Sequence, residues 1–337
     1  MKIIECHGSP LEMGRQYGEA AREEIVYSRE LWQPYFRNYP IRPFFLRETA
    51  AVLEKYAPDT ALELQGIAEG AGVPLDFLFA VNHTDTFGPE VERCTPLLLR
   101  RSPEGIIVAK NNDAAIGEKF PFVIRKCRPD RGIPFIQVTY AGWISGLDMM
   151  NAEGLANTHG SVGSIFPRTG RRIDIRLRIY ELMKSCRTID ELIYGLQDPE
   201  VPLTGKGFSI AAGDSRGECA FIDAAVPNIL VRDRNRQFSW STNLYEAPGL
   251  ENADQRPAEL KPFCQARSRY ISERKPPVDL AGIKALLSDH SVTFAPCRHG
   301  GKSHSVTVWS MYCLPEKGCV GVADGTPCNT PFRELEI

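Results

Sequence analysis

The sequence feature that most constrains the fold is a change of pattern near residue 93. Before this point the chain carries helix-start signals, and after it short runs of β-forming residues alternate with tight turns. Turns that end in Gly connect pairs of these runs, which predicts hairpins around 102–105, 214–217 and 315–318. Helical stretches interrupt the strands around 172–197 and 262–288. Many antiparallel strands with intervening helices predict a layered α+β domain.

Capping boxes locate three of the predicted helix starts. In such a box a Ser or Thr side chain and a Glu three residues later satisfy each other's free backbone N–H groups. The boxes are Ser9-Pro10-Leu11-Glu12, Thr60-Ala61-Leu62-Glu63 and Thr188-Ile189-Asp190-Glu191. The first has proline at the first helical position, so we expect a helix to begin at Pro10.

Composition excludes several classes of function. The 337 residues include 40 Lys and Arg against 42 Asp and Glu, a net charge of −2. This balance argues against broad electrostatic binding to nucleic acid or to an anionic membrane. No apolar run reaches the ~18–20 residues of a membrane-spanning helix, and the first residues lack the apolar stretch of a secretory signal. We therefore expect a soluble, cytoplasmic protein without nucleic-acid or membrane partners.

Ten cysteines in 337 residues are too few for a disulfide scaffold, and no Cys-x-x-Cys pair occurs. The best metal-like cluster is Cys297-Arg298-His299, followed by Cys313 and Cys319. Its spacing fits no common zinc pattern. We expect buried, reduced cysteines, no metal and no cofactor.

The hairpin around Pro103-Glu104 predicts which residues face each other. For a two-residue loop, facing residues have numbers that sum to 207, so Cys94 lies opposite Asp113. A bulge or a longer loop would shift this register by a residue or two. Lys110, Asn111 and Asn112 lie on the same return strand, so polar side chains gather at one end of a sheet. The alternative is a solvated strand end with a buried cysteine.

Several segments, in order along nearly the whole chain, resemble one family of N-terminal-nucleophile hydrolases. That family is the acyl-coenzyme A:6-aminopenicillanic acid acyltransferase family, peptidase family C45. The matching segments are Gly8-Ser-Pro-Leu-Glu12-Met-Gly14-Arg-Gln-Tyr-Gly18, Cys94-Thr95, Lys110-Asn111-Asn112-Asp113, Met150-Asn151-Ala-Glu153-Gly154-Leu155, Ser241-Thr242-Asn243, Asp289-His290, Cys297-Arg298-His299 and Gly325-Thr-Pro327-Cys328.

The resemblance implies a four-layer αββα sandwich of antiparallel sheets formed by a single domain, 1–337. It also implies an inactive precursor that cuts itself between Arg93 and Cys94. The products would be a helical N-terminal segment, 1–93, and a second chain, 94–337, that carries the nucleophile. The new α-amine of Cys94 would have a pKa near neutrality, about 7.7–8.0, and would serve as base for its own thiol.

The resemblance also implies roles for individual residues. Cys94 would form a thioester with the acyl group of the substrate, and Asp113 would orient the α-amine. Lys110 would stabilise charge near the thiolate, and Asn243 would donate to the oxyanion. A strand-end lysine and a turn asparagine are the structural alternatives for the last two. The family's late arginine has three candidates, Arg267, Arg269 and Arg298.

These expectations describe a self-processing enzyme that hydrolyses or transfers an acyl group from a small-molecule, non-peptide amide or acyl donor. Trp143, Phe120, Phe122 and Tyr140 are candidates for an acyl pocket or for plain core. One alternative is a papain-like enzyme that pairs Cys94 or Cys297 with a histidine such as His299 and needs no cleavage. Another is a binding protein of the same fold without catalysis. The sequence does not specify the acyl group or the oligomeric state.

Overall fold

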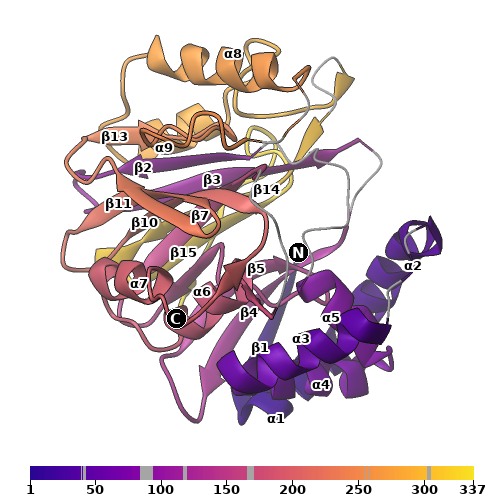
Figure 1. The fold of residues 1–337 in the computed structure, drawn as a ribbon. Coiled ribbons are helices and arrows are strands. Elements are labelled where there is room, and N and C mark those ends of the chain that lie inside the picture. Colours follow the sequence, from indigo (N-terminus) through magenta and orange to yellow (C-terminus); the bar gives the residue numbers. More distant parts are fainter. Residues whose placement is uncertain are drawn as a thin grey trace.

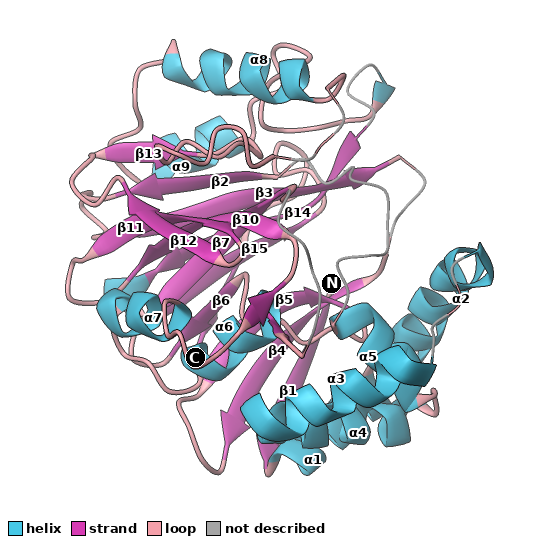
Figure 2. Cartoon of the chain, viewed as in Figure 1, coloured by secondary structure: helices cyan, strands magenta, loops and turns pink. Residues whose placement is uncertain are grey.

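The computed structural model describes residues 1–38, 40, 43–83, 94–116, 120–164, 171–254, 256, 258–301 and 305–337. Two large β-sheets stack face to face, with helices on both outer sides (Figure 1). Figure 2 shows the strands at the centre and the helices at the periphery. The predicted four-layer αββα sandwich is confirmed.

The first sheet has the strand order β1-β4-β5-β6-β7-β10-β11-β12. In chain order its strands are β1 (Lys2–Gly8), β4 (Phe122–Pro129), β5 (Phe135–Tyr140), β6 (Met149–Asn151), β7 (Ala156–Val162), β10 (Gly207–Gly213), β11 (Cys219–Ala225) and β12 (Asn228–Arg232). All its pairs are antiparallel except β1 with β4, which run parallel at the sheet edge. The expectation of purely antiparallel sheets is therefore wrong at this edge.

The second sheet has the order β13-β2-β3-β14-β15-β16 and is antiparallel throughout. Its strands are β2 (Thr95–Leu99), β3 (Ile107–Ala115), β13 (Phe238–Trp240), β14 (Ser305–Leu314), β15 (Cys319–Asp324) and β16 (Arg333–Glu336), and a separate parallel pair joins β8 (Ile173–Asp174) to β9 (Leu203–Thr204). The three predicted hairpins are β2–β3, β10–β11 and β14–β15.

Helices cover the outer face of each sheet. They are α1 (Pro10–Ala20), α2 (Arg22–Asn38), α3 (Pro43–Tyr56), α4 (Pro58–Ala71), α5 (Leu75–Asn82), α6 (Ile175–Met183), α7 (Ile189–Leu196), α8 (Lys261–Ser272) and α9 (Leu280–Leu287). Side chains of α8 and α9 pack on β2 and β3, whereas α1, α4 and α6 pack on the first sheet. A third core fills the space between the sheets.

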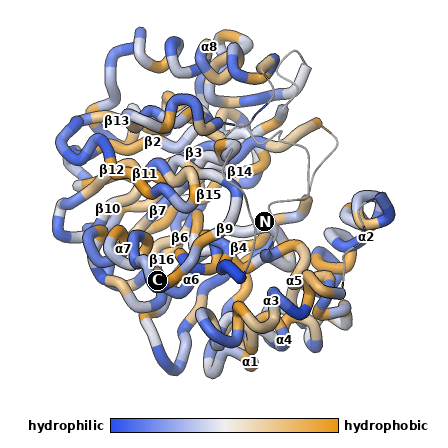
Figure 3. Tube along the Cα trace, viewed as in Figure 1, coloured by the Kyte–Doolittle hydropathy of each residue, from blue (hydrophilic) through white to orange (hydrophobic). Residues whose placement is uncertain are grey.

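Hydropathy follows this layering (Figure 3). The short α5 helix is hydrophobic along most of its length and is almost fully buried, whereas hydrophilic and hydrophobic residues alternate along α8 on the surface. Within the described part of the chain, no helix combines the length and apolarity that crossing a membrane requires.

The glycines of the N-terminal motif allow two helices to approach closely. A Cβ at Gly14 would lie 2.1 Å from the carbonyl oxygen of Glu63, and one at Gly18 would lie 2.5 Å from that of Ile67. Because no real Cβ tolerates such contacts, α1 and α4 can cross at this distance only with glycine. The motif therefore serves packing.

Two of the three predicted boxes mark true helix starts, but only the first forms completely, because Glu191 accepts from the Arg187 N–H and not from that of Thr188. Ser9 caps α1 with Glu12, and Thr188 caps α7 by accepting from the Glu191 N–H. The prediction at Thr60 is wrong, because α4 already begins at Pro58. Glu63, the expected box partner, is buried and pairs with Arg125.

Candidate active site

Cys94 directly precedes β2, and the register of the β2–β3 hairpin determines its neighbours. Thr95 faces Asn111, and Leu99 faces Ile107. Extended by one residue, this register brings Cys94 opposite Asn112, so the predicted pairing with Asp113 is wrong by one position. Pairing stops before the tight turn, because the N–H of Arg100 leaves the hairpin and donates to the carbonyl of Gln237.

The shift of one residue matters because successive side chains of a strand point to opposite faces. Val108 belongs to the core between the sheets, whereas Ile107 and Ala109 belong to the core under α8 and α9. Lys110 and Asn112 therefore point between the sheets, as Val108 does. Asn111 and Asp113 point to the outer side.

On the inner face, the Cys94 thiol lies against an amide oxygen. Its Sγ is 3.4 Å from Asn112 Oδ1, and the Lys110 ammonium donates to the same oxygen at 2.9 Å. All three side chains are buried. A single atom, Asn112 Oδ1, therefore separates the Cys94 thiol from the Lys110 ammonium. Sequence reasoning had placed Lys110 near the thiol but missed Asn112 as the residue between them.

Lys110 also joins the two sheets. Its Nζ lies 2.8 Å from Asp148 Oδ2 and 3.4 Å from His159 Nδ1, and His159 Nδ1 lies 3.0 Å from Asp148 Oδ1. Burial alone would raise the pKa of Asp148, but the charges of His159 and Lys110 outweigh it and lower that pKa. Nothing in the sequence distinguished Asp148 or His159.

Asp113 occupies a different environment on the outer face. Thr307 donates to its Oδ1 at 2.7 Å, and Arg267 Nη1 lies 3.7 Å from its Oδ2. Among the described residues, no donor forms a hydrogen bond to Oδ2. Burial raises the pKa of Asp113 to about 6, although the charges of Arg298 and Arg267 act against the rise.

Asn243 follows β13, the neighbour of β2 on the side away from β3. Trp240 faces Leu97, and the N–H of Ser241 donates to the carbonyl of Pro96, which continues the pairing. Extension of this register aligns Asn243 with Cys94. Asn243 itself turns out of the strand with φ = 66°, a left-handed conformation that asparagine tolerates better than most residues.

The hydrogen bonds of Asn243 determine which way its amide points. Its Oδ1 accepts from Arg267 Nη2 at 2.7 Å, and its Nδ2 donates to the carbonyl of Ser161 at 2.8 Å. A guanidinium can only donate and a carbonyl can only accept, so the amide cannot be reversed. The bond to Ser161 uses one of the two Nδ2 hydrogens.

Two of the three candidate arginines reach the neighbourhood of Asp113. Arg267 on α8 is fully buried and contacts both Asp113 and Asn243. Arg298 is also buried, and its charge acts on Asp113. Arg269 lies on the exposed side of α8.

Of the four aromatic residues singled out in the sequence, Phe122 and Tyr140 pack against the core between the sheets, whereas Phe120 and Trp143 pack against the core under the helices of the first sheet. Tyr140 accepts a hydrogen bond from Asn112 Nδ2 at 2.9 Å, and its ring contacts those of Phe120 and Trp143. Phe122 packs on Trp309, which also contacts Tyr140. Asn112 therefore connects the Cys94 thiol to a cluster of aromatic side chains.

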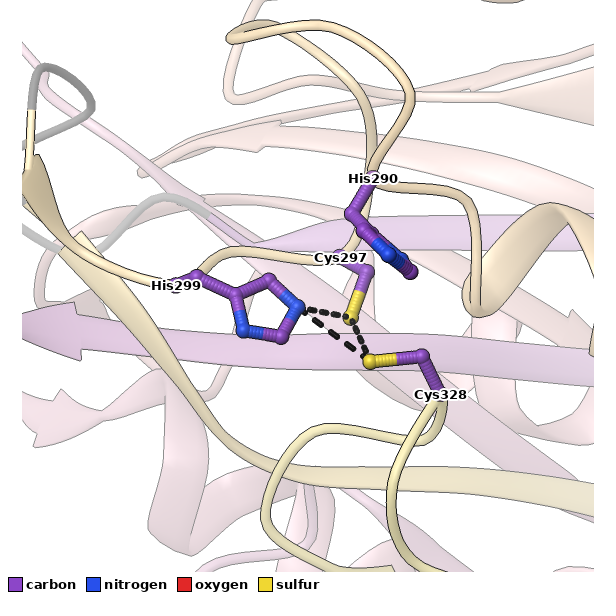
Figure 4. A group of neighbouring side chains, drawn as sticks. All are labelled: His290, Cys297, His299 and Cys328. Atoms are coloured by element: carbon purple, nitrogen blue, oxygen red, sulfur yellow. Dashed lines mark hydrogen bonds between the residues drawn. The ribbon is translucent and has the colours of Figure 1, made fainter.

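The cysteine and histidine cluster has members other than those expected. Cys297 Sγ lies 3.5 Å from His299 Nε2, but the neighbouring ligand atoms belong to Cys328 and His290 (Figure 4). Cys313 and Cys319 lie elsewhere, on β14 and β15. Arg93, one half of the predicted cleavage site, lies outside the described residues.

A scan against models of known protein families finds no match, and no curated protein matches the chain. Solved structures resemble it weakly. Penicillin V acylase from Agrobacterium tumefaciens is 12% identical, with a TM-score of 0.46 over 72% of this chain and 86% of that one. A mutant of the conjugated bile acid hydrolase from Clostridium perfringens is 14% identical, with a TM-score of 0.43 over 72% and 92%. A Caenorhabditis elegans N-acylethanolamine-hydrolyzing acid amidase ortholog is 14% identical, with a TM-score of 0.44 over 66% and 93%. Likenesses at this level carry no information on individual residues.

Proposed function

We propose that this protein is a self-processing cysteine hydrolase of the N-terminal-nucleophile type, similar to peptidase family C45. It would act on small-molecule acyl amides through a thioester on Cys94 and pass the acyl group to water or to an amine. The observation that carries the proposal is the setting of the thiol. Cys94 lies opposite Asn112, which contacts the Lys110 ammonium, and on its other side the extended β2–β13 register aligns it with Asn243.

Self-cleavage would create the catalytic base. The Cys94 thiol attacks the carbonyl carbon of residue 93, the peptide nitrogen leaves as the α-amine of Cys94, and water hydrolyses the resulting thioester to free the 1–93 segment. The α-amine, with a reference pKa of about 7.7–8.0, can then take the thiol proton. The hydrolysis therefore needs no catalytic histidine.

Acyl transfer would follow in two balanced steps. The thiolate attacks the amide carbonyl of the substrate, and the α-ammonium gives its proton to the departing amine as the thioester forms. Water, or a second amine, then attacks the thioester and restores the thiol. The second Nδ2 hydrogen of Asn243 would bind the oxyanion in both tetrahedral intermediates. Lys110 would stabilise the thiolate through its field.

Asp113 would bind the new α-amine. Its Oδ2 is buried and accepts no hydrogen bond among the described residues. The α-ammonium group would donate a hydrogen bond to this oxygen. Asp113→Asn keeps the shape and removes the charge, and we expect slow processing and reduced turnover from it.

Mass spectrometry under denaturing conditions tests the scissile bond. We expect the purified protein to separate into chains 1–93 and 94–337, and Cys94→Ala to give the full-length chain alone. Cys186→Ala, which removes a buried thiol beyond the end of α6, should be cut normally. An intact wild-type chain with full amidase activity would falsify the mechanism.

A second candidate is a papain-like enzyme, favoured by the 3.5 Å contact between Cys297 and His299. In that case the uncut chain is active, Cys297→Ala abolishes turnover, and Cys94→Ala leaves it unchanged. The proposed mechanism predicts the opposite dependence on the two cysteines, and a binding protein without catalysis shows no turnover in any variant.

A further inference from the structure

Four potential metal ligands converge beside the second sheet, at a place distinct from the Cys94 thiol. His290 and Cys297 belong to the loop after α9, His299 forms a bridge to Val306 at the start of β14, and Cys328 follows β15. Their ligand atoms all lie within 4.8 Å of one another. Figure 4 shows the side chains turned toward a common centre. Among the described residues, no other group of His, Cys, Asp and Glu meets this criterion.

The separations among Cys297, His299 and Cys328 match three edges of a tetrahedron around zinc. With Zn–S of about 2.3 Å and Zn–N of about 2.0 Å, sulfur atoms lie about 3.8 Å apart, and sulfur and nitrogen about 3.5 Å apart. Here Cys297 Sγ and Cys328 Sγ are 3.6 Å apart. His299 Nε2 lies 3.5 Å from the first sulfur and 3.2 Å from the second.

We propose that His290, Cys297, His299 and Cys328 bind one Zn²⁺ ion in a closed, structural Cys2His2 site. Two thiolates and two imidazoles are the ligands that zinc prefers, and four protein ligands leave no open position for a substrate. Binding releases the two thiol protons to solvent, because the ligands are thiolates. The ion needs no oxidant or reductant.

Neither alternative use of these side chains accounts for all four. A catalytic pair of Cys297 and His299 gives Cys328 and His290 no task. A disulfide between Cys297 and Cys328 needs the sulfurs at about 2.05 Å and leaves both imidazoles unused. Metal binding uses every member of the cluster.

The ion would connect two segments that are distant in sequence, residues 290–299 and the segment around Cys328, and it would hold Arg298, which lies between two ligands. The Arg298 N–H donates to Thr307 Oγ1 at 2.9 Å, and that hydroxyl donates to Asp113. The zinc site would thus position Arg298 beside Asp113. The site itself stands independently of the proposed function.

The experiment measures zinc in tag-free, full-length protein by plasma mass spectrometry. We expect one zinc per chain, and at least tenfold less in Cys297→Ser and in Cys328→Ser. Cys319→Ser is the matched control, since Cys319 is a half-buried cysteine like Cys328 but outside the cluster, and it should retain the full zinc content. Equal zinc in all four proteins, or none in wild type expressed with added zinc, overturns the site.

Two further measurements keep the test decisive if a variant fails to fold. Wild type stripped of metal with a chelator should bind one Co²⁺ and develop the thiolate charge-transfer band of a tetrahedral site. Its absence overturns the proposal. Peptide mapping without reductant should recover Cys297 and Cys328 as free thiols, and a disulfide between them overturns the proposal as well. Neither measurement depends on cleavage before Cys94, so this proposal and the proposed function can fail separately.

Discussion

The two faces of β3 differ in how their charges are paired. On the inner face, Lys110 meets Asp148 at 2.8 Å and shares an oxygen of Asn112 with the Cys94 thiol. On the outer face, Asp113 has arginines nearby but only one hydrogen-bonded oxygen among the described residues. The pKa of the inner aspartate is lowered, and that of the outer one is raised to about 6.

This contrast separates a closely hydrogen-bonded ion pair from a carboxylate with one oxygen, Asp113 Oδ2, that accepts no hydrogen bond among the described residues. Burial costs both carboxylates the same kind of desolvation free energy, and only close donors repay it. Asp148 has such donors in the uncut chain. Asp113 would gain its donor only when cleavage creates an α-ammonium. The charges of the inner face are therefore paired in the uncut chain, and under the proposed mechanism the outer face would bind the product of cleavage.

The largest expected effect comes from breaking the inner pair. Lys110→Met leaves Asp148 buried with one of its two cationic partners removed, so we expect the free energy of unfolding to fall by about 3–5 kcal/mol. Urea denaturation in the Cys94→Ala background measures this loss, because every molecule there is uncut.

Lys2→Met is the control for Lys110→Met. Lys2 pairs with Glu24 at a similar distance, 2.7 Å, but its side chain is 38% exposed. An exposed pair contributes about 0–1 kcal/mol, so this variant should lose little stability. Equal losses from the two variants would show that the buried Lys110–Asp148 pair contributes no more stability than an exposed one.

The next largest effect concerns Asn243, which binds Arg267, the arginine that also pairs with Asp113 on the outer face. We expect Asn243→Ala to lower kcat by about 10²–10³, roughly 3–4 kcal/mol, with little change in KM. Asn243→Gly should lose the same activity while it relieves the left-handed backbone of strain. Each variant is first allowed to complete its cleavage before Cys94. Its turnover is then measured on a series of N-acyl amides of increasing acyl length.

Asn151→Ala is the structural control for Asn243. Asn151 is also buried, and its amide donates to the carbonyls of Met183 and Cys186 away from the thiol. This variant should melt at a lower temperature and keep its kcat. Normal kcat with a lower melting temperature in Asn243→Ala would assign Asn243 to the fold and leave the oxyanion donor unidentified.

Local signals in the sequence predicted much of the fold. Turn residues located the hairpins, and Ser9 and Thr188 marked true helix starts. The failures have physical causes. Glu63 forms a buried ion pair instead of a capping box, and the β2–β3 turn is longer than two residues, which moves Asn112 opposite Cys94.

The contacts missed in the candidate site all join segments that are far apart in sequence. Asp148 and His159 reach Lys110 from the other sheet, and Arg267 reaches Asp113 from α8. Cys328 approaches Cys297 from beyond β15. Propensity and spacing report on neighbours along the chain, so packing between layers alone determines these pairs.

The smallest effect is a dependence of stability on pH that should differ in sign between the two faces. The pKa of Asp113 is about 6 in the folded chain and near 3.8 when unfolded. Between these values the folded state binds more protons than the unfolded one, so Asp113 makes stability fall as pH rises from about 4 to 6. A difference of two units corresponds to about 3 kcal/mol at most.

Asp113→Asn in the Cys94→Ala background should remove this decrease in the free energy of unfolding between about pH 4 and 6. The hydrogen bond lost in the variant lowers stability by the same amount at every pH and does not change the slope. Asp148→Asn should behave in the opposite way. The pKa of Asp148 is lowered by folding, so its charge contributes stability above the unfolded value near 4 that is lost at lower pH. The deficit of Asp148→Asn should therefore grow as pH rises from acid and then level off. Urea denaturation from pH 3 to pH 8 measures both slopes. Slopes of the same sign would mean that Asp113 is already paired in the uncut chain, and that no place is prepared there for the α-amine.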